Sequence, residues 1–306
     1  MNIMIEIGKV KRNSPGTGKA TMILSFHPCL VTDYQIILGD RTLEVGDFEL
    51  IEKADVIILP QGCAYGLYQA AKESSALIFP NYDARFAYPG KTGQSELFMK
   101  ADCPRPATTA WQSVEHFRRR ISESGQGPHN YPFLIKTSYS HEGKGVFFIS
   151  NRSSLEVALD KVAVSEKTGR SGFVSQEMVA SEGNVLRAVI LGTEIITYWK
   201  RPQNPGQVIT TISSGADIDK TWRKDLQEKG RKEAARFCTR TGINLAAIDF
   251  VFALDAPDPS PLFLEINYFF GRRGLGGTLR YYGLLYRAVQ KWIEDRGLDP
   301  SAVTLF

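Results

Sequence analysis

The sequence predicts an α/β protein, with α+β character in its later part, built from two or three lobes around a cleft. Over roughly the first 90 residues, short β-type runs alternate with turns and a helical segment, which is typical of a small, mostly parallel sheet. Further along, alternating runs joined by short polar turns indicate antiparallel hairpins. The length of 306 residues also exceeds one average hydrophobic core.

The composition is that of an ordinary soluble globular chain, with 43% hydrophobic and 23% charged residues. No apolar run approaches the roughly 18 residues of a membrane span, and the start lacks the apolar segment of a secretory signal, so we expect a cytoplasmic protein that does not use a membrane. The four cysteines are scattered without metal-binding spacing. A net charge of +4 fits an anionic substrate such as a nucleotide without requiring nucleic acid.

The N-terminal α/β domain is expected to span residues 1–90. It should contain strands within 20–26, 34–38, 54–60 and 75–81 and a helix over 64–74. Ligands of such sheets bind beyond the carboxyl ends of strands, which makes His27, Gln61 and Gly62 weak candidates for lining a cleft. The segment 14–21, SPGTGKAT, lacks the first glycine of a phosphate-binding P-loop and is interpreted as a turn.

A second, smaller subdomain is expected over residues 91–175. Thr92 can cap a helix and would leave Lys91 just before its positive end, where a lysine can reinforce anion binding or simply face solvent. The segment 131–150 predicts a hairpin in which Lys136 precedes a polar loop containing Gly143 and Gly145. Such a loop can fold its backbone N–H groups over phosphates, although a glycine turn is also a common structural feature. A helix with a capping box from Ser153 to Glu156 should follow.

The third subdomain is expected over residues 176–306. Its first strand end carries Gln176, Glu177, Met178 and Val179, which can read an adenine or simply end an amphipathic strand. A hairpin over 185–202 turns at Gly192 and displays three basic residues suited to phosphate or to solvent: Arg187, Lys200 and Arg201. The helix over 221–242 should end at Gly242.

A metal site is predicted where the runs 243–254 and 261–267 form an antiparallel hairpin. Strand alternation places Glu265 and Asn267 on one face of the second run. With residue 254 opposite 262, Asp249 faces Asn267, whereas a slip of two residues places it opposite Glu265. Both registers bring three hard oxygen ligands together, as Mg²⁺ prefers, and two opposed carboxylates on an apolar sheet would repel without a cation.

These residues, in this order, resemble the ATP-grasp superfamily, most closely its glutathione synthetase and ribosomal-protein glutamate ligase (RimK-like) branch. The resemblance covers roughly residues 85–295 and implies an ATP-grasp fold in which a pre-ATP-grasp lobe precedes two subdomains that clasp ATP. The order and spacing of the motifs carry the resemblance, because no single motif is very specific.

The resemblance implies a role for each matching position. Lys91 and Lys136 would contact the nucleotide phosphates, beneath a mobile loop from Ser140 to Gly145. Residues 176–179 would hold adenine, and Glu182 would contact the ribose. The basic residues near the phosphates would be Arg187, Lys200 and Arg201. The ligands of two Mg²⁺ ions, with Mn²⁺ as an alternative, would be Asp249, Glu265 and Asn267.

The sequence departs from this branch at three places. Val185 stands where the glutamate ligases carry an acidic residue, and the segment VITTISSGAD over 208–217 replaces an asparagine, an arginine and a double glycine. After Asn267, the segment NYFFGRRGLGG replaces a small-residue and proline turn. Arg272 and Arg273 can therefore bind a carboxylate of an acidic substrate, or they can be two exposed arginines. We expect substrate choice to lie in this segment.

The family implies an ATP-dependent carboxylate–amine or carboxylate–thiol ligase that forms an acyl phosphate and releases ADP and phosphate. The substrates would be ATP, a small carboxylate and an amine-bearing acceptor such as an amino acid, a peptide or a protein terminus, and assembly as a homo-oligomer is left open. The alternative is a catalytically silent nucleotide-binding or regulatory protein of the same fold. A weaker alternative, an RNA-binding protein, rests on the basic pI alone.

Overall fold

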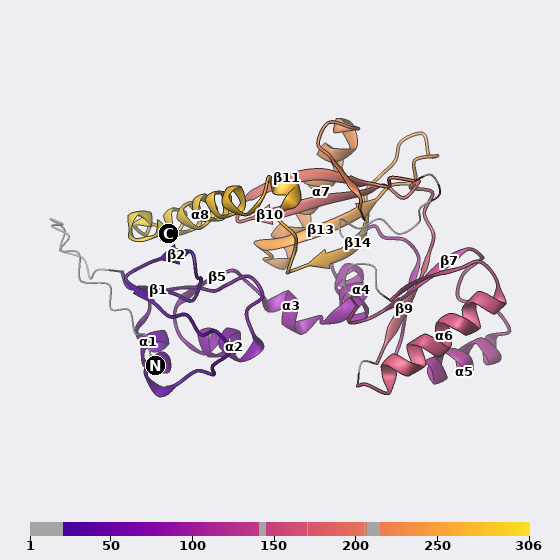
Figure 1. Ribbon diagram of the computed structural model, residues 1–306, viewed down its shortest axis with the longest axis horizontal. Coiled ribbons are helices and arrows are strands. Elements are labelled where there is room, and N and C mark those ends of the chain that lie inside the picture. Colours follow the sequence, from indigo (N-terminus) through magenta and orange to yellow (C-terminus); the bar gives the residue numbers. More distant parts are fainter. Residues whose placement is uncertain (1–20, 141–144, 170, 205, 207–214) are drawn as a thin grey trace.

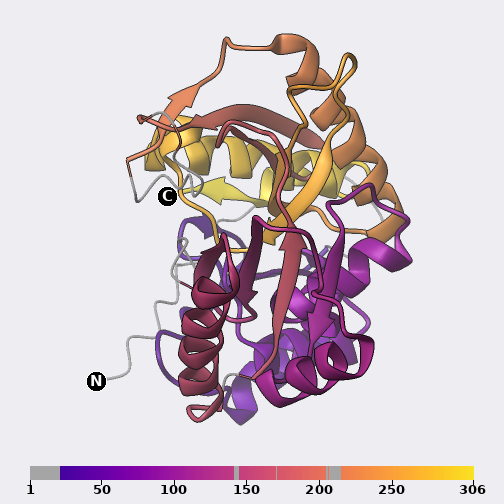
Figure 2. The same ribbon diagram turned by 90° about the vertical axis from the view of Figure 1, so that its right-hand side faces the viewer.

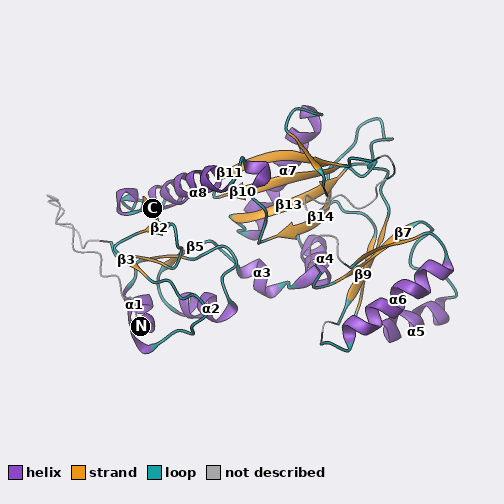
Figure 3. Cartoon of the chain, in the orientation of Figure 1, coloured by secondary structure: helices purple, strands orange, loops and turns teal. Residues whose placement is uncertain are grey.

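The computed structural model describes residues 21–140, 145–169, 171–204, 206 and 215–306, and it confirms the predicted α/β class (Figure 1). Three lobes, each built on a β-sheet, are visible when the ribbon is coloured by secondary structure (Figure 3). Two short helices, α3 (Asp83–Ala87) and α4 (Gly90–Lys100), link the N-terminal lobe to the others. No described helix is both long and apolar enough to cross a membrane.

The N-terminal lobe holds a parallel sheet in the order β3-β1-β4-β5, as its alternating pattern predicts. Its strands and helices are β1 (Ile23–Ser25), β3 (Tyr34–Gln35), β4 (Val56–Ile58), β5 (Leu77–Phe79), α1 (Val45–Lys53) and α2 (Tyr65–Glu73). Leu24 and Ile57 pack with α1 and α2 in one core, whereas Ile23, Val56 and Ile58 point to the other face. Alternation along each buried strand therefore gives this sheet two apolar faces.

The small lobe is an antiparallel sheet in the order β6-β9-β7-β8, with α5 and α6 standing against it in the end-on view (Figure 2). Its elements are β6 (Thr108–Trp111), α5 (Val114–Ser124), β7 (Phe133–Thr137), β8 (Val146–Ile149), α6 (Arg152–Glu166) and β9 (Phe173–Glu177). The predicted hairpin is β7–β8. At its turn Gly145 has φ +98° and approaches Thr137 and Ser140 so closely that a Cβ would collide.

The large lobe is an antiparallel sheet in the order β12-β11-β10-β13-β14. Its elements are β10 (Val185–Leu191), β11 (Glu194–Arg201), β12 (Asp217–Asp219), α7 (Lys224–Thr241), β13 (Leu245–Val251) and β14 (Leu262–Asn267). Leu186, Ile248 and Phe250 face α7, while Val189, Tyr198 and Ala247 face the opposite side. The hairpin turn at Gly192 and the helix end at Gly242 lie where the sequence predicts.

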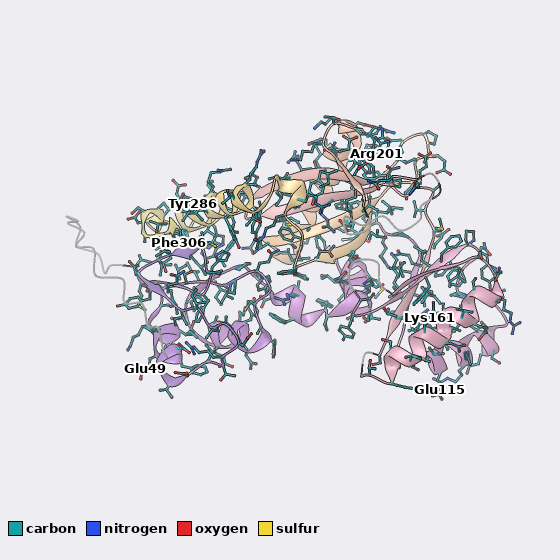
Figure 4. All side chains as sticks on the ribbon, viewed as in Figure 1. Glu49, Glu115, Lys161, Arg201, Tyr286 and Phe306 are labelled. Carbon is teal, nitrogen blue, oxygen red and sulfur yellow. The ribbon has the colours of Figure 1, made fainter. Side chains whose placement is uncertain are left out.

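The last part of the chain returns to the N-terminal lobe, which the sequence did not predict. Helix α8 (Thr278–Glu294) lies between the N-terminal and large-lobe sheets and joins the apolar faces of both into one core. After the short helices η1 (Arg273–Leu275) and η2 (Pro300–Ala302), strand β15 (Thr304–Leu305) pairs with β2 (Leu30–Val31). In Figure 4, Tyr286 and Phe306 mark this returning segment beside the N-terminal lobe.

Three local predictions were wrong. Helix α4 begins at Gly90 with Pro89 as its N-cap, so Thr92 does not cap it and Lys91 lies in the first turn. The capping box of α6 is formed by Asn151 and Ser154, because the helix begins at Arg152. The boundary expected between residues 175 and 176 falls inside β9. Most of 14–21 and 208–217, together with Gly143, lies outside the described residues.

Candidate functional site

The candidate site lies on one face of the large-lobe sheet, where four strands place polar side chains side by side. Arg187 on β10 is opposite Tyr198 on β11 and Asp249 on β13, and Asp249 is opposite Glu265 on β14. Side chains of opposed residues share a face, so the predicted convergence of Asp249, Glu265 and Asn267 is present. The register is the second of the two predicted, and it shifts after Asp249 at an irregularity in the β13–β14 pairing.

A buried ion cluster forms the centre of this face. The Arg187 guanidinium donates two hydrogen bonds of 2.8 Å to the two carboxylate oxygens of Asp249, and Lys200 Nζ donates a third of 2.8 Å. The three side chains are only 11%, 4% and 6% exposed in the order Arg187, Asp249, Lys200. Asn267 Nδ2 adds a longer contact of 3.3 Å to Asp249 Oδ2.

The cluster shifts the ionisation of its members. Burial opposes ionisation of Asp249, but the adjacent Arg187 and Lys200 charges outweigh it and hold its pKa below the usual range. Burial also disfavours the Arg187 cation, yet Asp249 raises the pKa of Arg187. For Lys200, burial wins and lowers the pKa. Two cations share one anion, so this part of the site carries a net positive charge suited to a polyanion.

Lys136 approaches the site from the small lobe. It is buried on β7, where its Nζ donates to Gln176 Oε1 at 2.5 Å, and Gln176 Nε2 in turn donates to Thr108 Oγ1 at 2.8 Å. Burial lowers the pKa of Lys136 to about 8, with Glu265 acting in the opposite sense. The side chain of Gln176 thus orients Lys136. The sequence had instead predicted that Gln176 contacts adenine.

Lys91 is held at the same place by the start of α4. Its backbone N–H donates to Ser138 O at 3.0 Å, and its Nζ donates to Ser140 O at 2.7 Å. Glu265 Oε1 lies 3.7 Å from Lys91 Nζ, which is the only ion pair of Glu265 within the described part of the chain. The helix start therefore carries Lys91 across to the strand that bears the predicted metal ligands.

Gln94, one turn further along α4, was missed by the sequence analysis. Its side chain donates to Ile266 O at 2.8 Å and accepts from Ile266 N at 3.0 Å. These two bonds fix the edge of β14 between Glu265 and Asn267. Helix periodicity in the sequence could have indicated this residue, because positions three apart in a helix share a face and Gln94 therefore lies beside Lys91.

Arg201 is separated from the group in which the prediction placed it. Strand alternation directs it to the face opposite Lys200, where its guanidinium lies 4.5 Å from the centre of the Trp222 ring and 3.2 Å from Asp219 Oδ2. Figure 4 labels Arg201 at this side of the large lobe. The structure therefore does not place Arg201 with Arg187 and Asp249.

The other predicted residues lie at the rim. Glu177 is exposed at the end of β9, and Met178 and Val179 are half-buried in the connection to β10. Glu182 is exposed at φ +50°. Ser140 accepts from Lys91, and Arg272 lies beyond β14 with its guanidinium over the rings of Tyr281 and Tyr282. The described residues contain no cluster of three His, Cys, Asp or Glu side chains suited to a metal, since the third member of the predicted set is an asparagine.

The three-lobed arrangement, in which Lys91 on α4 and Lys136 on the small lobe approach a large-lobe sheet bearing Asp249, Glu265 and Asn267, is that of the ATP-grasp fold, and solved structures agree. A RimK-domain ATP-grasp protein from Sphaerobacter thermophilus aligns with 87% of this chain and 98% of its own, with a TM-score of 0.55 at 14% identity. An ADP complex of N5-carboxyaminoimidazole synthetase from Staphylococcus aureus aligns with 83% of this chain and 65% of its own, with a TM-score of 0.56 at 15% identity.

The family follows from the sequence match. The model of the RimK-like ATP-grasp domain matches residues 90–280, and the chain belongs to this family. A tetrahydromethanopterin:α-L-glutamate ligase from Methanosarcina acetivorans is 26% identical in an alignment of 164 residues, which covers 51% of this chain and 48% of that protein. The matched regions span only 34 to 48% of the curated relatives compared.

Proposed function

We propose that the protein is an ATP-dependent ligase that joins a carboxylate to an amine, or to a thiol, through an acyl phosphate. The observation that carries the proposal is the convergence of Lys91 on α4 and Lys136 on the small lobe with Arg187, Asp249 and Glu265 on the large lobe. Cations around a polyanion and oxygen ligands for a divalent ion are what phosphoryl transfer needs, since it depends on positioning and charge stabilisation.

The reaction balances in two steps. A carboxylate oxygen of the substrate attacks the γ-phosphorus of ATP, the bond to the β,γ-bridging oxygen breaks, and ADP leaves. The nitrogen of the amine then attacks the acyl carbon, the acyl–phosphate bond breaks, and phosphate leaves while the amine loses a proton to solvent. The match to a named glutamate ligase supports the formation of a C–N bond.

Lys136, Lys91 and Arg187 would bind the phosphates in this scheme. Lys136 is directed by Gln176, so its side chain does not have to be ordered when the nucleotide binds, whereas Arg187 would have to turn from Asp249 toward the phosphates. The cavity between Lys91, Lys136, Gln176 and Phe263 has a volume of only ≈ 20 Å³. Nucleotide entry at that point therefore requires side chains or lobes to move apart.

The oxygen donors fit Mg²⁺ unequally. Glu265 is 29% exposed, and its one ion pair among the described residues is a long contact to Lys91. The nitrogen of the Asn267 amide donates to Asp249, which would leave the amide oxygen to bind a cation. Asp249 already accepts from Arg187 and Lys200, so it would contribute to metal binding when those cations turn toward phosphate. Mg²⁺ would neutralise charge on the transferring phosphoryl group.

The proposal is tested by measuring ADP release with MgATP and a panel of amino acids, small acids and peptides. We expect at least one acid and acceptor pair to stimulate release, and Glu265→Gln to lower it by about hundred- to thousand-fold, the effect typical of losing one charge-stabilising group. Glu115→Gln on the exposed face of α5 serves as the matched control. Binding of MgATP without stimulation by any pair would point instead to a nucleotide-binding protein without turnover.

A further inference from the structure

The segment that follows β14 is a fixed, basic turn. The carbonyl oxygen of Arg272 accepts hydrogen bonds from Leu275 N at 3.0 Å and from Gly277 N at 3.1 Å. Leu275 is buried in the core shared with α8, and Gly274 lies so close to the ring of Tyr198 that a Cβ would overlap it. Because Tyr198 is opposite Arg187 in the β10–β11 ladder, this turn rests directly on the sheet that carries the site.

The side chain of Arg272 is held in place and forms no ion pair with the residues that the structure describes. Its guanidinium carbon lies 4.7 Å from the centre of the Tyr281 ring and 4.5 Å from the centre of the Tyr282 ring. None of the ion pairs in the described part of the chain involves Arg272. By contrast, the guanidinium of Arg187, on the sheet beneath this turn, is paired with Asp249. The guanidinium also interacts with the Tyr282 side chain through a hydrogen bond, and the remaining N–H groups of its planar five-donor fork match a carboxylate.

The start of helix α8 adds positive charge beside Arg272. Helix α8 begins at Gly277 with no side-chain cap and no acidic residue in its first turn, so its positive end points to the same turn. His27, at the carboxyl end of β1, lies 5.7 Å from Tyr282 ring to ring, and burial, helped by Arg272, lowers its pKa to about 4. His27 is therefore neutral at ordinary pH and does not repel the guanidinium.

The place also belongs to the junction between lobes, where a substrate can reach both. Gln61, beyond β4, donates to Tyr268 O at 3.3 Å and accepts from the Tyr281 hydroxyl at 3.1 Å. The strand ends of the N-terminal sheet thus meet the segment that follows Asn267, and ligands of parallel sheets bind at this edge. An anion held here would lie between the N-terminal lobe and the face that carries Arg187 and Asp249.

We propose that Arg272 binds a carboxylate of the substrate and so selects an acid-bearing substrate over its amide or ester. The statement that this ligand is the substrate rests on the proposed ligase function; the anion site itself does not. The tyrosine rings keep the guanidinium in place before binding, which lowers the entropic cost of the contact.

The test uses probe pairs that differ only in a carboxylate: L-glutamate with L-glutamine, L-aspartate with L-asparagine, and succinate with succinamate. Each probe is titrated calorimetrically into the whole chain with Mg²⁺ and a non-hydrolysable ATP analogue. We expect at least one acid to bind about ten- to hundred-fold more tightly than its amide, the range typical of a charge-assisted hydrogen bond. Arg272→Met should reduce that ratio to near one, and Arg272→Lys should leave an intermediate ratio.

Arg273→Met is the matched control, because Arg273 is the exposed neighbour in the same turn and should keep the wild-type ratio. Thermal unfolding of every variant is recorded, and if the methionine variant does not fold, the lysine variant decides. The proposal is overturned if the wild-type chain prefers no acid in any pair, or if a folded Arg272 variant keeps the full preference. Failure of the ATP analogue to bind wild type would instead refute the ligase function.

Discussion

Replacing Asp249 with asparagine should destabilise the protein far more than removing a surface carboxylate. Asp249 is the one acceptor shared by Arg187 and Lys200, and all three side chains are nearly inaccessible to solvent. Loss of one partner of a buried ion pair costs about 3–5 kcal/mol, since the remaining charge stays buried without compensation. Out of a typical folding stability of about 5–15 kcal/mol, this is a large fraction. Urea denaturation followed by tryptophan fluorescence measures the change, because Trp199 and Trp222 lie on the other face of the same sheet.

A second substitution tests whether an unpaired buried charge causes this destabilisation. In the wild-type background Lys200→Met should destabilise, because it removes a hydrogen bond to Asp249. In the Asp249→Asn background the same change should stabilise, because it removes a buried cation that has lost its partner. Asp160→Asn is the surface control, with an exposed side chain 3.8 Å from Arg118 and an expected effect of less than about 1 kcal/mol. A loss in Asp249→Asn as small as in this control, or the same sign for Lys200→Met in both backgrounds, would refute the account.

Three other outcomes are expected. Because the pKa of Lys136 is lowered to about 8, its ammonium loses its charge as pH rises through that value, and the affinity for MgATP should fall across this range. The Lys136→Met variant should bind MgATP more weakly, with a flatter pH dependence, in calorimetric titrations. Gly274→Ala should cost about 1–3 kcal/mol by overpacking against Tyr198, whereas Gly271→Ala, which meets nothing within 4 Å, should be nearly neutral in urea denaturation. Gly283→Ala lies inside α8 with open space around its Cβ and should raise stability by roughly 0.5–1 kcal/mol, seen as a higher thermal midpoint.

Strand alternation was enough to predict the face that bears Asp249, Glu265 and Asn267, because the side-chain period of a strand is fixed. It could not distinguish the two registers, which depend on the turn and on the irregularity after Asp249. The same rule, applied to β11, would have separated Arg201 from Lys200. That error came from treating two adjacent basic residues as one motif.

Other features depend on contacts between distant segments and leave little trace in one sequence. Nothing local shows that Arg187 and Lys200 would both bind Asp249, since this needs the order of three strands. The predicted roles of Lys91 and Glu177 in nucleotide binding stay predictions. The place of α8 was likewise hidden, because an amphipathic helix shows that it has a partner but does not show which sheet that partner is.

The return of α8 and β15 makes the N-terminal lobe discontinuous along the chain. Its sheet exposes one apolar face until residues from Tyr281 to Val303 arrive, and β2 pairs with Thr304 and Leu305 of β15. During synthesis, this lobe would therefore leave the ribosome well before the segment that completes its core. A fragment ending at residue 90 should expose that apolar face and aggregate, and adding residues 278–306 as a separate peptide should rescue it only by binding there.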